Sequence, residues 1–140
     1  MCRMLATGLI AIAGIAFAAP GPKDAPKRES SIVGEWELLT VNGQKAAPGT
    51  YKFNSDGSGV ARGSIANVVS PEFRWKYTTD EKANPFEIDM TGDDLHEKGI
   101  FKIEGDRLTI CFRVGSDRRP RKFGEDGAME EVFERIKKKD

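Results

Sequence analysis

The fold is decided by residues 73–79, which read FRWKYTT. Aromatic residues occupy every second position and basic residues lie between them, which is the period of a strand with one buried face. The aromatic face comprises Phe73, Trp75 and Tyr77. The segment therefore predicts a half-buried β-strand whose apolar side faces the core.

The next segment along the chain, Pro85–Thr91 (PFEIDMT), repeats this alternation. Its apolar face comprises Phe86, Ile88 and Met90, and carboxylates fill the positions between them. Two neighbouring segments with the period of a strand predict an antiparallel pair.

Five further stretches alternate in the same way and are separated by turn residues. Tight turns are predicted at Asn42-Gly43, at residues 55–58 and at residues 104–106. The predicted strands are Gly34–Val41, Thr50–Asn54, Gly59–Ile65, Lys98–Ile103 and Leu108–Val114.

The last element fits two patterns. Met129, Val132, Phe133 and Ile136 have the spacing of an amphipathic helix, and residues 132–136 also fit a short strand. The local pattern alone favours the helix.

These segments predict an all-β fold, a small antiparallel up-and-down β-barrel of about eight strands. The connections are too short for the crossovers that parallel strands require. A sheet of this size with one apolar face removes its exposed edges by closing on itself.

The N-terminus has the pattern of an export signal. The apolar run Leu5–Phe17 follows Arg3, is too short to span a bilayer and ends in the A-x-A pattern of residues 16–18. We expect a cleaved signal peptide over residues 1–18 and export to the periplasm or the extracellular space, with no integral membrane segment in the mature chain.

Residues 19–31 are rich in proline and charge and predict a flexible linker, which leaves residues 32–138 as the domain. Cleavage leaves Cys111 as the only cysteine, so no internal disulfide is expected. No neighbouring His or Cys in the sequence would activate Cys111, which favours a small apolar strand residue over a reactive thiol.

Composition limits the classes of partner. The 140 residues suffice for one domain, and 39% hydrophobic with 31% charged residues is typical of a soluble globular protein. The 22 basic and 22 acidic residues balance, whereas nucleic-acid binding needs a basic excess. We therefore expect no nucleic-acid partner.

A series of short motifs runs through the chain in a fixed order. It comprises Gly34-Glu35-Trp36, Tyr77–Asp80, Pro85–Asp89, Gly99–Phe101, Gly105–Phe112 and Arg119–Phe123. Together these resemble the lipocalin-like domain of unknown function found in many copies in planctomycete bacteria. The resemblance extends from Ile32 to Lys137 and implies a lipocalin-like barrel, but it implies no activity.

The resemblance also assigns structural roles. In lipocalins an Arg of the last strand covers the Trp of the G-x-W element. Arg135 is therefore expected over Trp36, next to Gly34, in a cation–π contact worth about 0.5–2 kcal/mol. Accordingly, residues 132–137 are expected to form a strand that pairs with the first one.

Candidate reactive groups form no recognisable catalytic or metal site. The single histidine, His96, has too few potential ligands around it for a zinc site. Asp80 and Asp89 could act as acid and base, but near turns such carboxylates commonly accept backbone N–H bonds. Asp93 and Asp94 are read in the same way, and the basic run 118–122 as a solvated loop. We expect no metal, no cofactor and no enzyme activity.

Two functions remain open. An aromatic and aliphatic set is expected inside the barrel, and it either fills the interior or encloses a small hydrophobic or amphipathic ligand. The first function is that of an exported lipocalin-like binding protein; the second is a solid-core structural or protein-interaction module of the cell envelope. The short strands favour a filled core slightly. The set is Phe53, Phe73, Trp75, Tyr77, Phe86, Ile88 and Met90.

Overall fold

The structure is a computed structural model that describes residues 31–65 and 68–139. The predicted signal peptide and all of the predicted linker except Ser31 lie outside the described residues. All helical or extended secondary structure within these two ranges consists of β-strands. None of these residues forms a helix able to cross a membrane.

The alternating segments form nine strands. Their bounds are β1 (Gly34–Val41), β2 (Gln44–Lys45), β3 (Gly49–Phe53), β4 (Ser58–Ile65), β5 (Val68–Asp80), β6 (Phe86–Thr91), β7 (His96–Glu104), β8 (Arg107–Phe112) and β9 (Met129–Arg135).

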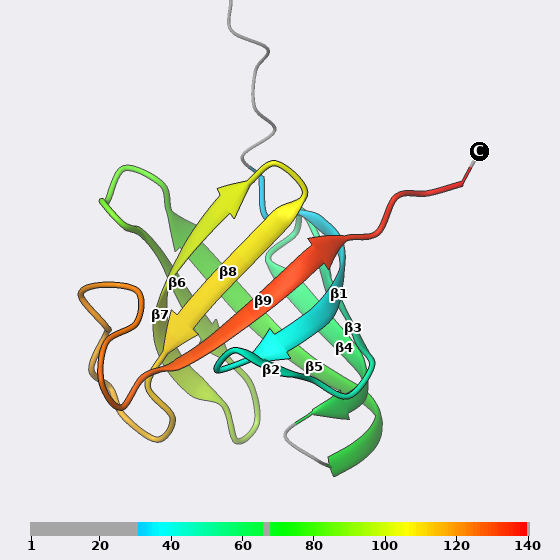
Figure 1. The fold of residues 1–140 in the computed structure, drawn as a ribbon, viewed down its shortest axis with the longest axis horizontal. Coiled ribbons are helices and arrows are strands. Elements are labelled where there is room, and N and C mark those ends of the chain that lie inside the picture. Colours follow the sequence, from blue (N-terminus) through cyan, green and yellow to red (C-terminus); the bar gives the residue numbers. More distant parts are fainter. Residues whose placement is uncertain (1–30, 66–67, 140) are drawn as a thin grey trace, which may run out of the picture.

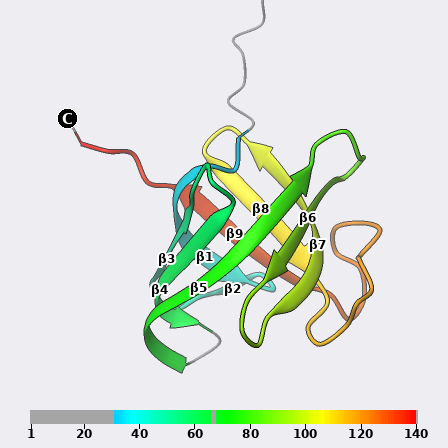
Figure 2. The ribbon, with the colours of Figure 1, turned by 180° about the vertical axis from the view of Figure 1, so that it is seen from behind.

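The strands form a closed antiparallel barrel (Figure 1 and, from behind, Figure 2). From β3 onward each strand pairs with the next, and β1 pairs with both β3 and β9. Eight strands thus make the barrel, and among the described strands the two-residue strand β2 pairs only with the C-terminal end of β1. The prediction of an all-β, up-and-down barrel of about eight strands is confirmed.

Several strand bounds differ from the sequence prediction. β5 begins at Val68 rather than Phe73, and β8 ends at Phe112, which leaves Val114 outside it and 62% exposed. β9 ends at Arg135 instead of Lys137. These are element ends, where pairing with a neighbouring strand decides the bound and the residue alternation does not.

The C-terminal element is a strand, as the family resemblance implies and against the local helical pattern. β9 pairs with β8 on one side and with β1 on the other. A helix would have left both neighbours with unpaired backbone groups, and this cost outweighs a local spacing preference. A register shift between Leu38 and Thr40 bends β1 where it follows β9.

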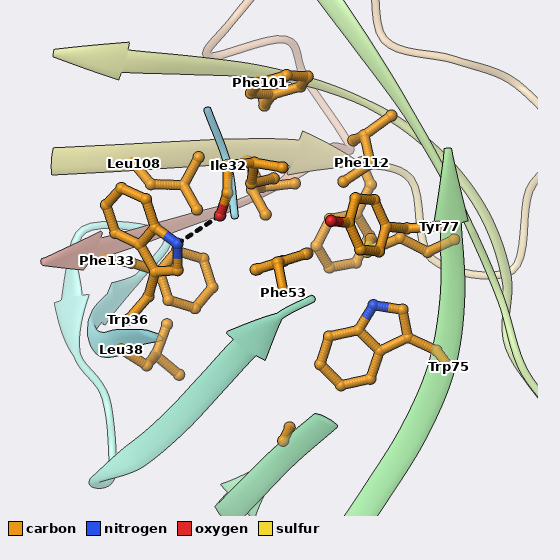
Figure 3. Packing of buried hydrophobic residues seen from close by; sticks show 14 residues of the cluster. Ile32, Trp36, Leu38, Phe53, Trp75, Tyr77, Phe101, Leu108, Phe112 and Phe133 are labelled. Carbon is orange, nitrogen blue, oxygen red and sulfur yellow. Dashed lines mark hydrogen bonds between the residues drawn. The ribbon is translucent and has the colours of Figure 1, made fainter. Parts of the chain in front are cut away.

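One end of the barrel is sealed around Trp36. This side chain is fully buried, and its indole N–H donates to the carbonyl oxygen of Ile32 at 2.8 Å (Figure 3). Ile32 is only 3% exposed and belongs to the same apolar cluster as Leu108 and Phe133. The chain before β1 therefore crosses the end of the barrel and closes it.

Arg135 locks this seal from the last strand. Its guanidinium carbon lies 4.1 Å from the centroid of the Trp36 ring, the cation–π contact expected from the resemblance. Its two Nη atoms donate to the carbonyl oxygens of Val33 and Ser31 at 3.1 and 3.0 Å. Gly34 has φ +141°, a backbone conformation that other residues rarely adopt, and a Cβ there would lie 2.8 Å from Nη1 of Arg135, so a larger residue would strain the backbone and displace the guanidinium.

The long connection of residues 113–128 covers the outside of the barrel. Its Pro120 is fully buried, as are Ile100 of β7 and Cys111 of β8, which lie outside the interior cluster. Cys111 is a free, buried thiol in a strand, as expected, and burial raises its pKa.

Arg119 fastens this connection to the barrel. Its Nη1 donates to the carbonyl oxygens of Gly99 and Ile88 at 2.7 and 3.2 Å, and its Nη2 donates to Asp89 at 2.7 Å. Two sequence interpretations are therefore wrong. Arg119 is not a solvated loop residue, and the Asp89 carboxylate accepts a hydrogen bond from the Arg119 guanidinium where one from the backbone N–H of a turn was expected. The interpretation of Asp80 holds, because its carboxylate accepts the backbone N–H of Lys82.

Replacing Trp36 by alanine should lower the free energy of unfolding by about 3–5 kcal/mol, because a fully buried indole and its hydrogen bond are lost. Urea denaturation measures the change. Ile136→Ala, at a position 36% exposed just beyond β9, is the control and should cost less than about 0.5 kcal/mol. Equal losses in the two variants would show that the seal is not a centre of stability.

Removing residues 132–140 should make the protein aggregate, because β1 and β8 would each expose an unpaired edge. Removing only residues 138–140, which follow β9, should leave solubility and the melting temperature unchanged. Size-exclusion chromatography of the two truncated chains distinguishes them. A monomeric, soluble product of the longer truncation would contradict the role of the β1–β9 pairing in closure.

Candidate functional site

A chamber lies in the half of the barrel away from the Trp36 seal. Its volume is about 250 Å³, and it is bounded by side chains from β1, β3, β5, β6, β7, β8 and β9 and from the connections beside them. Its lining includes Val114, the most exposed large apolar residue described, so the chamber reaches solvent there. The interior is thus packed at the sealed end and hollow at the other.

Four of the seven predicted ligand-binding residues line the chamber: Phe53, Phe73, Trp75 and Met90. They come from three different strands, β3, β5 and β6, and alternation aims them inward.

The other three predicted residues do not line it. Tyr77 points away, and its hydroxyl donates to the carbonyl oxygen of Asn54 at 2.6 Å. Phe86 packs on Phe101, with ring centroids 5.5 Å apart, and Ile88 is fully buried in the core. These residues lie nearer the sealed end of β5 and β6, where the core is filled.

Trp75 is the centre of an aromatic wall, of which Figure 3 shows Trp75 itself and Phe53. Its ring centroid lies 5.7 Å from those of Tyr51 and Phe53 and 6.0 Å from that of Phe73, which stacks on it at 26°. The indole lies against Gly59 of β4, where a Cβ would overlap the ring. Glycine at this position therefore lets the indole lie flat against β4.

The indole N–H of Trp75 is buried and has no hydrogen-bond partner among the described residues. The side chain is 5% exposed, and its ring lines the chamber. An unsatisfied donor of this kind is uncommon in a core.

Two carboxylates, Glu97 of β7 and Glu131 of β9, also line the chamber. Glu131 precedes the buried Phe133 by two positions, and Glu97 precedes Gly99 in the same way, so both face inward. The sequence analysis placed neither of them inside the barrel. The available signal was the glutamate at the inward position of the last strand, which breaks the apolar alternation of Met129 and Phe133.

Burial perturbs the titration of these groups. It raises the pKa of Glu97 to about 6. Burial is the main cause, and repulsion from the Glu97 carboxylate the second, of a pKa of Glu131 that is raised to about 7. Burial and both carboxylates together hold the pKa of the Tyr51 hydroxyl well above its usual value. The three groups therefore share one electrostatic environment.

Neither glutamate forms an ion pair with a cation of residues 31–65 or 68–139. The wall around them is apolar, with Leu38, Ile110 and Phe112 among its members. A carboxylate in such surroundings is stabilised when a cation or a hydrogen-bond donor reaches it.

The other candidates for chemistry are dispersed. His96 is exposed, and its Nε2 lies 3.7 Å from a carboxylate oxygen of Asp117. Within the described residues no group of three or more His, Cys, Asp or Glu side chains could hold a metal ion.

Comparisons with protein-family models, with curated proteins and with solved structures gave no match.

Glu131→Gln should stabilise the protein at pH 8 and have little effect at pH 4.5. With a folded pKa near 7 and an unfolded pKa of about 4.3, the folded chain holds a proton that the unfolded chain has lost, so stability falls as pH rises through this window. The variant should gain about 1–3 kcal/mol at pH 8 by denaturant titration.

The control for this prediction is Glu134→Gln, on the exposed outer face of the same strand, which should leave the pH dependence unchanged. A gain for Glu131→Gln that is equal at both pH values would contradict the raised pKa.

Proposed function

We propose that this protein is an exported binding protein that holds one small apolar or amphipathic molecule in the chamber of its barrel. The observation that carries the proposal is the chamber itself, an aromatic-walled cavity of about 250 Å³ with a few polar groups. Small-molecule sites have this composition, concave and mostly apolar with few polar groups. The proposed role is binding, without catalysis.

The volume limits the size of the ligand. Cavities of about 150 Å³ accept a benzene molecule, and drug-sized ligands occupy pockets of about 300–1,000 Å³. A chamber of about 250 Å³ lies between them. It suits a single ring with a short side chain, or an alkyl chain of similar volume.

The rest of the barrel supports this role as a rigid frame. The sealed end around Trp36 prevents passage through the barrel, so a ligand enters and leaves on the side of Val114. Leu95, in the connection between β6 and β7, also lines the chamber. Chain closure through β1 and β9 fixes the positions of the wall residues before a ligand arrives, which reduces the entropy cost of binding.

The resemblance to the planctomycete lipocalin-like domain is consistent with this role, and so is the predicted signal peptide. A filled, solid-core interaction module is the less favoured alternative, because such a module has no use for a chamber with inward-facing carboxylates.

A tryptophan at Val114 should block the chamber. This position is 62% exposed and lines the chamber, so a larger side chain fits there without disturbing the core. Isothermal titration with 2-phenylethanol, a neutral probe with one ring, should show at least about tenfold weaker binding for Val114→Trp than for the unmodified chain.

Val33→Trp is the matched control. Val33 is 38% exposed and lies at the sealed end, so this variant should bind the probe as the unmodified chain does. Equal weakening in both variants, or none in either, would show that the probe does not enter through this side.

A further inference from the structure

The polar side of the chamber is acidic. Its titratable groups are Tyr51 from β3, Glu97 from β7 and Glu131 from β9. The other strands contribute apolar side chains, such as Leu38 from β1, Met90 from β6 and Ile110 from β8. None of the described side chains that line the chamber is a lysine, arginine or histidine. Any positive charge beside these carboxylates therefore has to come from the molecule that binds.

The placement of the carboxylates is costly in the free protein. An ionised carboxylate in an apolar cavity loses solvation, and two of them repel each other. Inward positions of β7 and β9 elsewhere carry residues such as Phe101 and Phe133, which are 1% and 0% exposed. Departures from a consistent apolar pattern of this kind are expected at functional sites.

The wall opposite suits the same charge. A cation over an aromatic face is attracted by the negative face of the ring, most strongly with tryptophan. Trp75 presents its ring to the chamber between Tyr51 and Phe73. Carboxylates and aromatic rings together favour an organic cation over an anion, and the apolar remainder of the wall favours a hydrocarbon attached to it.

We infer that the chamber selects small amphipathic amines, whose ammonium group is bound by Glu97 and Glu131 and whose hydrocarbon part lies against Trp75. This inference rests on the proposed binding function and adds the chemical class of the ligand. An ammonium group donates up to three hydrogen bonds, enough to engage both carboxylates at once. Anionic amphiphiles such as fatty acids are disfavoured by repulsion from the same two groups.

Binding of the amine is coupled to protonation. An ammonium group is bound most strongly when both carboxyls are ionised, and burial raises their pKa values to about 6 and about 7. An alkylammonium group has a pKa of about 10, like that of a lysine side chain, so it keeps its charge throughout this range. The affinity for an amine should therefore rise between pH 5 and pH 8, while the affinity for a neutral probe should not.

The test compares three probes of one shape at pH 8 by isothermal titration: 2-phenylethylamine, 2-phenylethanol and 3-phenylpropionate. The amine should bind at least about tenfold more tightly than the alcohol, and the carboxylate should bind most weakly. At pH 5 the advantage of the amine over the alcohol should shrink to less than about threefold.

Glu131→Gln and Glu97→Gln should each remove most of the preference for the amine at pH 8 while retaining binding of the alcohol. Glu134→Gln, on the outer face of β9, is the matched control and should keep the full preference. The retained binding of the alcohol shows that the glutamine variants are folded, and thermal melting confirms it.

The outcomes separate the two proposals. Equal affinity for the amine and the alcohol at pH 8 would overturn the selectivity for amines and leave the chamber as an apolar binding site. A preference for the amine that survives both glutamine variants would also overturn it, because the cation would then be bound elsewhere. Failure of all three probes to bind would overturn the proposed binding function itself.

Discussion

The hydrogen bonds between β1 and β9 turn a meander of strands into a closed barrel, and the rest of the structure depends on that closure. The two strands are the first and the last of the described strands, so their pairing joins residues with the largest separation in sequence of any strand pair in the sheet. Arg135 strengthens the seam by covering Trp36 and binding the carbonyl oxygens of Val33 and Ser31. One side chain thereby joins the last strand, the first strand and the segment that crosses the barrel end.

Sealing one end has a consequence for the other. The side chains around Trp36 fill the sealed half of the barrel, whereas in the opposite half the large side chains form the wall of a chamber and do not fill it. The seal also makes the interior a pocket and not a channel. Within this pocket Glu97 and Glu131 are the groups that distinguish it from an ordinary apolar cavity.

The motifs behind the family resemblance have structural roles in this chain. Trp36 forms the seal, while Asp89, Gly99 and Arg119 hold the connection of residues 113–128 against the outside of β6 and β7. Glu97 and Glu131 lie outside every one of these motifs. A resemblance that depends on such motifs therefore predicts the barrel and its fastening, and it carries no information about the polar groups of the chamber.

The sequence by itself determined the strands, their antiparallel order and the inward faces, because side-chain alternation has a period of two and turn residues separate the segments. It could not decide between helix and strand for residues 129–136, since the answer lies in the unpaired edges of β1 and β8, which exist only once the sheet has formed. It also could not divide the interior into a packed and a hollow half, because that depends on which rings meet across the barrel. The charge of the chamber was decided in the same way. Glu97 and Glu131 are distant in the chain; the pairing of β7 and β9 with β8 places them on one face of the sheet. Closure then encloses both carboxylates in one apolar space, where burial raises both pKa values and repulsion from Glu97 raises that of Glu131 further.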